Sequence, residues 1–203
     1  MRRMSRQRRK AESVSEPFET RLFIHRLTQT EKAAVYVHNT AFPSSELAAA
    51  LASAVEDVCV DKLIRADGCL KLAQHLALGT DNESLRAAIS RAYYCIHHCL
   101  RAIALWQGKW DPDGHEQSIE EFRQLLKDTP FRVRLGLPEN TGSRVAEART
   151  NRHVADYSPY DFQRTPPDTR PIGITNERWS DAVQFNISLA EEIFQAAMKR
   201  IGS

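Results

Sequence analysis

The chain has 203 residues, of which 42% are hydrophobic and 27% charged, and this length suits one domain with extensions. No apolar run approaches the roughly 20 residues needed to cross a bilayer, and no apolar segment follows the basic start as it would in a secretory signal. The net charge of +2 is uneven, because residues 1–10 hold six of the 28 basic residues and no acidic one, which leaves 22 basic against 26 acidic residues elsewhere.

The N-terminal part of the chain predicts two segments outside the main domain. Residues 1–17 are polar and basic, so we expect a disordered tail. This tail is either a leader upstream of a start at Met4 or a flexible arm that binds phosphate backbone without sequence specificity. Residues 18–45 contain two short apolar runs, at 21–27 and 33–38, which form either a hairpin or one irregular arm.

Residues 46–203 carry the periodicity of amphipathic helices and no convincing alternating strands. Apolar residues recur at gaps of three and four from about Glu46 to Leu78, and the following turn offers Asp81 or Asn82 as a helix cap. The remaining expected elements are, in order, helices at about 83–108 and 118–127, a loop at 134–143, a short helix from about 144, a proline-rich connection at 166–175 and a helix at 176–200. This pattern predicts an all-α bundle of four to five helices.

Residues 89–100 read ISRAYYCIHHCL, which gathers two cysteines and two histidines into five positions. Cys95, His98 and Cys99 stand at i, i+3 and i+4, so one helical face could present three zinc ligands. Cys99 belongs to the apolar stripe, however, and no second ligand pair supplies a fourth ligand. We therefore expect no metal, and we interpret these cysteines as core residues with the histidines at the edge of the stripe.

The four cysteines also bear on location. They occur in a chain without a secretory signal, which is typical of reduced thiols in a cytosol. The sequence therefore predicts a cytoplasmic protein that requires no cofactor and does not enter a membrane.

The polar side of the helix at 83–108 carries Arg91, Tyr94, His98 and Arg101, at gaps of three, four and three. These side chains either line a groove or form an ordinary exposed helix face, since both give the same spacing. The periodicity alone does not choose between the two.

Three short motifs follow one another in register with the expected helices. SRAYY at 90–94 precedes a helical run, His115 stands ahead of the third helix, and 152–157 read RHVADY before the last helix. Together they resemble the HEPN superfamily (higher eukaryotes and prokaryotes nucleotide-binding domain) over roughly residues 60–203. Residues 1–45 have no counterpart in this resemblance.

The resemblance implies a compact helical bundle that is usually a dimer. Many HEPN members are metal-independent ribonucleases, often toxins encoded beside a minimal nucleotidyltransferase, and their catalytic pattern is Arg, four to six residues, then His. In such a reaction a histidine can move protons near neutral pH, and an arginine fork stabilises the negative charge that develops on the phosphoryl oxygens. No metal is required.

The present sequence departs from that catalytic pattern. Only three residues separate Arg149 from His153. In the register set by the ADY triplet, Arg152 aligns with the motif arginine and Asp156 stands near the position of the histidine. An aspartate, with a reference pKa of about 3.9, is a poor proton donor at neutral pH. Arg152 and Asp156 either form an i,i+4 ion pair that orders the helix end or line a functional pocket, and Tyr157 either caps the core or stacks on a base.

Two groups of candidate site residues follow from the motifs and the resemblance. The catalytic candidates are Arg149, Arg152, His153 and Asp156. The candidates for nucleotide or RNA binding are Arg91, Tyr94, His98, His115 and Tyr157. Three functions remain open: a ribonuclease or toxin-like protein acting on RNA, a non-catalytic module that binds RNA, a nucleotide or a nucleotidyltransferase partner, and a structural adaptor. A homodimer is expected in each case.

Overall fold

A computed structural model describes the backbone of residues 45–108, 114–157 and 176–201. It describes the side chains of residues 52–108, 114–157 and 179–201. The predicted basic tail, the N-terminal arm up to residue 44 and the proline-rich connection lie outside these ranges. The described residues contain six helices and no strand: α3 (Ser45–Leu76), α4 (Asn82–Trp106), α5 (His115–Lys127), α6 (Thr129–Leu135), α7 (Thr141–Tyr157) and α8 (Asn176–Ile201). The predicted all-α fold is confirmed.

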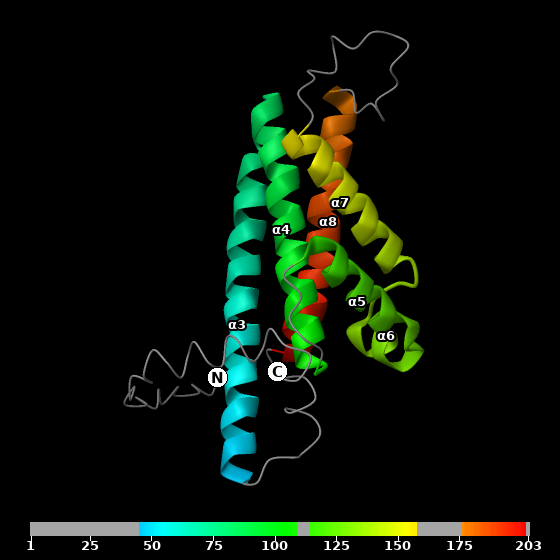
Figure 1. Cartoon of the computed structure of the whole chain (residues 1–203). Helices are drawn as coiled ribbons and strands as arrows, with labels where there is room; N and C mark the ends of the chain where they lie inside the picture. The colour runs from blue at the N-terminus through cyan, green and yellow to red at the C-terminus, as the bar shows by residue number, and fades with distance from the viewer. Residues whose placement is uncertain (1–44, 109–113, 158–175, 202–203) are drawn as a thin grey trace, which may run out of the picture.

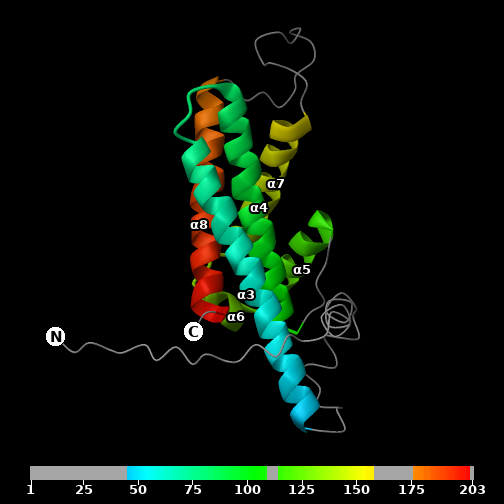
Figure 2. The same ribbon diagram turned by 90° about the vertical axis from the view of Figure 1, so that its left-hand side faces the viewer.

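Helix α4 is the centre of the bundle. It packs against α3, α8, α7 and α5, and 15 of its 25 residues are buried. Figure 1 shows the long helices α3, α4 and α8 side by side, with α5, α6 and α7 added on one side. Figure 2 shows that the first turns of α3 extend beyond the ends of α4 and α8. The single apolar stripe expected for α4 is therefore too narrow, because α5 and α7 cover a second side of this helix.

The turn before α4 contains the predicted cap. Asp81 is the N-cap residue, and its carboxylate accepts a hydrogen bond from the backbone N–H of Ser84 at 2.8 Å. The same carboxylate accepts the Ser84 hydroxyl at 2.6 Å. These bonds satisfy an amide that the first turn leaves without a helical partner.

Two boundaries differ from the expected ones. Helix α5 begins at His115 rather than near 118, because its N-cap is Gly114, which has no side chain to signal the start. The loop expected at 134–143 is shorter, since α6 ends at Leu135 and α7 begins at Thr141. Helix α6 was not predicted because it has only seven residues, too few to show a period. It ends at Gly136, whose φ of +71° is the left-handed conformation that favours glycine.

Three of the four cysteines, including both in the 89–100 stretch, belong to the core. Cys59, Cys95 and Cys99 are buried and carry free thiols, and burial raises the pKa of Cys99 well above its usual value. Neighbouring His97 is also buried rather than at the edge of the stripe, which corrects the expected position of one histidine. No helix in the described part of the chain combines the length and apolar character needed to cross a membrane.

Helices α5 and α7 pack in opposite directions. The first turn of α7 lies at the C-terminal half of α5, where Gly142 lies close to the side chains of Arg123 and Leu126. Further along α7, Arg149 forms an ion pair with Glu116 in the first turn of α5, at 2.8 Å. The α5–α7 pair therefore has two ends, and each end holds arginine side chains.

Candidate functional site

The first end of the α5–α7 pair is centred on Arg152. Helix α7 turns Val145, Ala148 and Ala155 into the core, and Arg152 follows Ala148 by four residues on the same face. Its side chain is consequently only 13% exposed. A guanidinium at such a position needs partners, because an unpaired buried charge is costly.

Three side chains surround the Arg152 guanidinium. Its Nε lies 2.6 Å from a carboxylate oxygen of Asp156. Its Nη2 donates to the Tyr94 hydroxyl at 3.0 Å and to the Tyr157 hydroxyl at 3.4 Å. Its central carbon also lies 5.4 Å from the centroid of the Tyr94 ring and 5.2 Å from that of Tyr157, within the range of cation–π attraction. Burial works against this charge, but Asp156 and the two tyrosines outweigh it and raise the pKa of Arg152.

The end of α7 is tied to α4 by a further arginine. The Nε of Arg86 donates to the backbone carbonyl of Ala155 at 2.7 Å. This bond satisfies one of the last carbonyls of α7, which have no helical partner. It fixes the turn that carries Asp156 and Tyr157 against the central helix.

Neutral histidines and a tyrosine form the other half of the site. The His115 ring lies 4.2 Å from the His97 ring, centroid to centroid, and its Nδ1 lies 3.2 Å from the Tyr93 hydroxyl. His115 is also 5.8 Å from the Tyr94 ring, so Tyr94 joins this half to Arg152. We call the set Tyr93, Tyr94, His97, His115, Arg152, Asp156 and Tyr157 the Arg152 cluster.

The surroundings of the histidines keep them uncharged. Burial, reinforced by His115 and nearby cationic residues, lowers the pKa of His97 to about 3. Burial, followed by the charges of Arg152 and Arg149, lowers the pKa of His115. Burial raises the pKa of Tyr93 to about 12. At neutral pH the pair formed by Tyr93 and His115 is therefore uncharged, and it can form with either tautomer of His115.

The structure gathers most, but not all, of the candidate residues. Arg91 lies with its guanidinium carbon 5.9 Å from the Tyr94 ring, on the exposed side of α4. His98 is half-buried, with its ring 6.0 Å from that of His97. Arg149 pairs with Glu116. His153 is exposed, and its ring lies 5.0 Å from that of Tyr157.

Two members of the cluster were missed from the sequence. Tyr93 and His97 are buried at the point where α4 meets α5, and neither was a candidate. A signal was present, since Ile89, Tyr93 and His97 follow each other at gaps of four on one row of α4. The row could have been read as a second inward face of the helix.

The cluster has the groups needed to bind a phosphate and a base. An arginine fork suits phosphate oxygens, aromatic rings suit a stacked base, and a neutral imidazole can accept or donate a proton. Among residues 45–108, 114–157 and 176–201, no group of three His, Cys, Asp or Glu side chains converges as metal ligands would.

Comparison with known protein families gives a match over most of the described residues. The model of a protein family described as the HEPN domain matches residues 60–201, which is more than half of the chain. The matched range begins within α3, ends at the last residue of α8 and contains the whole Arg152 cluster. Neither the curated proteins nor the solved structures include a match to the chain.

Proposed function

The chain belongs to the HEPN domain family, and on that premise we propose that it binds RNA or a free nucleotide at the Arg152 cluster. Membership supports a nucleotide- or RNA-related function in general. The observation that carries the more specific proposal is the position of the Arg152 guanidinium over the rings of both Tyr94 and Tyr157. An arginine held in this way presents its charge in one orientation, which lowers the entropy lost when a phosphate binds.

The guanidinium retains capacity for a ligand. Its contacts with Asp156, Tyr94 and Tyr157 engage Nε and Nη2, and within the described residues Nη1 has no partner. Tyr157 is 61% exposed, so a base can stack on the outer side of its ring. A phosphate on Arg152 and a base on Tyr157 can therefore belong to the same nucleotide.

The test measures binding of a fluorescently labelled single-stranded oligoribonucleotide by anisotropy. Arg152→Lys keeps the positive charge but loses the planar fork, and it is expected to weaken binding about tenfold. Arg134→Lys is the matched control, because Arg134 is an exposed arginine on α6, outside the cluster. Equal affinities of wild type and Arg152→Lys for both the oligoribonucleotide and free nucleotides would contradict the proposal.

A second candidate is metal-independent RNA cleavage, and the lowered pKa of His115 favours it. A neutral His115 can take the proton of a ribose 2′-hydroxyl while that oxygen attacks the adjacent phosphorus. The bond from phosphorus to the 5′-oxygen then breaks, the 5′-oxygen takes up a proton from solvent, and a 2′,3′-cyclic phosphate remains, while Arg152 stabilises the charge on the phosphoryl oxygens. Loss of cleavage in His115→Ala but not in His153→Ala would support this reaction. RNA left intact by the wild type would exclude it.

The family resemblance also motivates partners. We propose a homodimer and a minimal nucleotidyltransferase partner, acting in a cytosol, with exposed Tyr157 as the side chain that the partner reads or modifies. Light scattering at tens of micromolar should give twice the mass of one chain. Co-expression with the product of a neighbouring gene should give a complex that Tyr157→Phe weakens or leaves unmodified. A monomer that recovers no such product would contradict both.

A further inference from the structure

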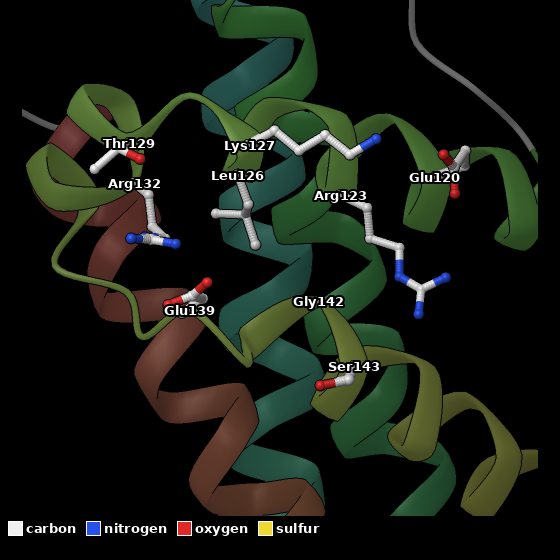
Figure 3. A pocket seen from close by; sticks show the side chains of 9 residues that line it. All are labelled: Glu120, Arg123, Leu126, Lys127, Thr129, Arg132, Glu139, Gly142 and Ser143. Atoms are coloured by element: carbon white, nitrogen blue, oxygen red, sulfur yellow. The ribbon is translucent and has the colours of Figure 1, made fainter.

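A pocket lies at the second end of the α5–α7 pair, far from the Arg152 cluster. It is bounded by the C-terminal half of α5, by α6 and by the first turn of α7, and its volume is about 700 Å³ (Figure 3). Its lining residues are Glu120, Arg123, Leu126, Lys127, Thr129, Arg132, Glu139, Gly142 and Ser143. Arg152 stands ten residues beyond Gly142 on α7, which is about 15 Å along the helix axis. The two ends are therefore separate sites.

Three basic side chains from two helices face this pocket. Arg123 and Lys127 stand on one side of α5 at i and i+4, and Arg132 comes from α6. Figure 3 shows the side chain of Leu126 between the two arginines, which separates their charges by an apolar surface. Leu126 is buried, so it fixes the base of the pocket.

The acidic residues of the pocket do not neutralise these arginines directly. The Glu120 carboxylate accepts the side-chain amide of Gln124, whose own oxygen accepts the Lys127 ammonium at 2.8 Å. Figure 3 shows Glu139 beside Arg132, but within the described residues no ion pair or hydrogen bond joins the guanidinium of Arg123 or Arg132 to a partner. Three basic and two acidic side chains leave the lining with a net positive charge.

The backbone of α7 adds a donor at the same place. The amides of Thr141, Ser143 and Arg144 bond to Pro138 and Asn140. In the described part of the chain the Gly142 amide has no such acceptor. Gly142 also lies close to α5, because a Cβ there would be 3.0 Å from Cγ of Arg123. A ligand between the helices can therefore reach this amide and the arginines together, at the positive end of a 17-residue helix.

We propose that this pocket binds a phosphate group, as an anion site separate from the Arg152 cluster. The recognising groups are the guanidinium forks of Arg123 and Arg132, the Lys127 ammonium and the Gly142 amide. The phosphate belongs either to a free phosphorylated small molecule or to the backbone of an RNA strand, since both present the same oxygens. None of the recognising groups belongs to the Arg152 cluster, so phosphate binding here is independent of the proposed function.

The experiment titrates the full chain with inorganic pyrophosphate by calorimetry. The double variant Arg123→Gln with Arg132→Gln is expected to lower the affinity for pyrophosphate about tenfold or more. Arg134→Gln removes a neighbouring exposed arginine outside the pocket, and it is expected to leave the affinity for pyrophosphate within about twofold of the wild type. Far-ultraviolet circular dichroism verifies that each variant keeps its helical content.

A second arm separates the two sources of phosphate. The same variants are tested with a single-stranded oligoribonucleotide over a range of salt. If the double variant loses both pyrophosphate and part of the RNA affinity, with a shallower salt dependence, the pocket holds RNA backbone. If it loses pyrophosphate only, the pocket holds a free phosphorylated ligand. The proposal is overturned if pyrophosphate gives no saturable binding to the wild type, or binds the double variant as tightly as the wild type.

Discussion

The two ends of the α5–α7 pair use arginine in opposite ways. At one end Arg152 is 13% exposed and already held by Asp156, Tyr94 and Tyr157. At the other end Arg123 is exposed, Arg132 is half-buried, and neither has an ion-pair partner among the described residues. The same residue type therefore serves as a fixed, oriented group in one site and as an open charge in the other.

This difference has an energetic meaning. A buried ion pair contributes little net stability, yet removal of one partner is expensive because the other is left desolvated. An exposed arginine contributes almost nothing to the free energy of unfolding. Substitutions in the Arg152 cluster should therefore change both ligand binding and the free energy of unfolding. Substitutions of the pocket arginines should change ligand binding alone.

The largest expected effect comes from acid, because buried His97 belongs to the Arg152 cluster and no histidine lines the pocket. Free histidine has a pKa near 6.5, whereas His97 in the folded chain has a pKa of about 3. The unfolded chain then takes up the proton first, so stability conferred by neutral His97 is complete at higher pH and is lost as pH falls from about 6.5 towards 3. The loss approaches about 1.4 kcal/mol per pH unit.

Urea unfolding at several pH values from about 8.5 down to about 4 measures this loss. His97→Leu should show a smaller decrease in the free energy of unfolding per pH unit than the wild type, whatever its stability at pH 7.5. The two proteins should vary in parallel above pH 7.5, where histidine is neutral in both states. If the free energies of unfolding of the two proteins stay parallel below pH 6.5, the folded chain does not lower the pKa of His97. The predicted difference in acid sensitivity between the two ends of the helix pair is then absent.

The next prediction compares the arginines themselves. Arg152→Leu removes the partner of Asp156 and the donor to two tyrosines, and it should lower the free energy of unfolding by about 2 kcal/mol. Arg123→Leu on the pocket side should change it by less than about 0.5 kcal/mol. Chemical denaturation at neutral pH measures both. Similar losses in the two variants would remove the distinction between a held and an open arginine.

The sequence predicted the held arginine better than the open ones. Arg152 and Asp156 stand four residues apart on one helix, so the spacing predicts an ion pair as one of two possibilities, and the structure contains that ion pair. The hydrogen bond from Arg152 to Tyr94 joins residues that are 58 positions apart, and it forms only because α4 and α7 pack together. Local spacing carries no information about such a contact.

The pocket was not predictable because it depends on an element that the sequence hid. Helix α6 has seven residues, with Pro130 in its first turn and Gly136 after its last. The stretch is too short to show a helical period, and only its last two residues fall in the loop expected at 134–143. Arg132 could not be assigned a face without that helix. The long helices α3, α4 and α8 were predicted because their apolar periodicity extends over several turns.

A smaller effect is expected when the acidic neighbour of each arginine is neutralised. Asp156→Asn leaves Arg152 with less compensation, so affinity for an oligoribonucleotide at low salt should rise about threefold, with a steeper salt dependence. Glu139→Gln is the matched change at the pocket and should raise affinity for pyrophosphate to a similar extent. Anisotropy and calorimetry measure the two. A fall in affinity in Asp156→Asn would mean that Asp156 serves mainly to position the arginine, and the cluster would then depend on geometry rather than charge.

The smallest effect is expected at the contact between the two helices. Gly142→Ala places a methyl group 3.0 Å from Cγ of Arg123, so that side chain must shift by a few tenths of an ångström. The better helix propensity of alanine offsets this crowding, and the free energy of unfolding should stay within about 0.5 kcal/mol of the wild type. Gly68→Ala on α3 is the control, because nothing lies within 4 Å of its added methyl group, and it should stabilise by about 1 kcal/mol.

Binding gives the sharper readout of that substitution. Since Arg123 must move away from the Gly142 amide, Gly142→Ala should weaken pyrophosphate binding about twofold and leave oligoribonucleotide binding at Arg152 unchanged. Equal stabilisation by Gly142→Ala and Gly68→Ala, with pyrophosphate affinity intact, would show that Arg123 is free to move and that only charge attracts the anion. The pocket would then bind the anion without a fixed arrangement of its arginines, whereas Asp156, Tyr94 and Tyr157 hold Arg152 in one orientation.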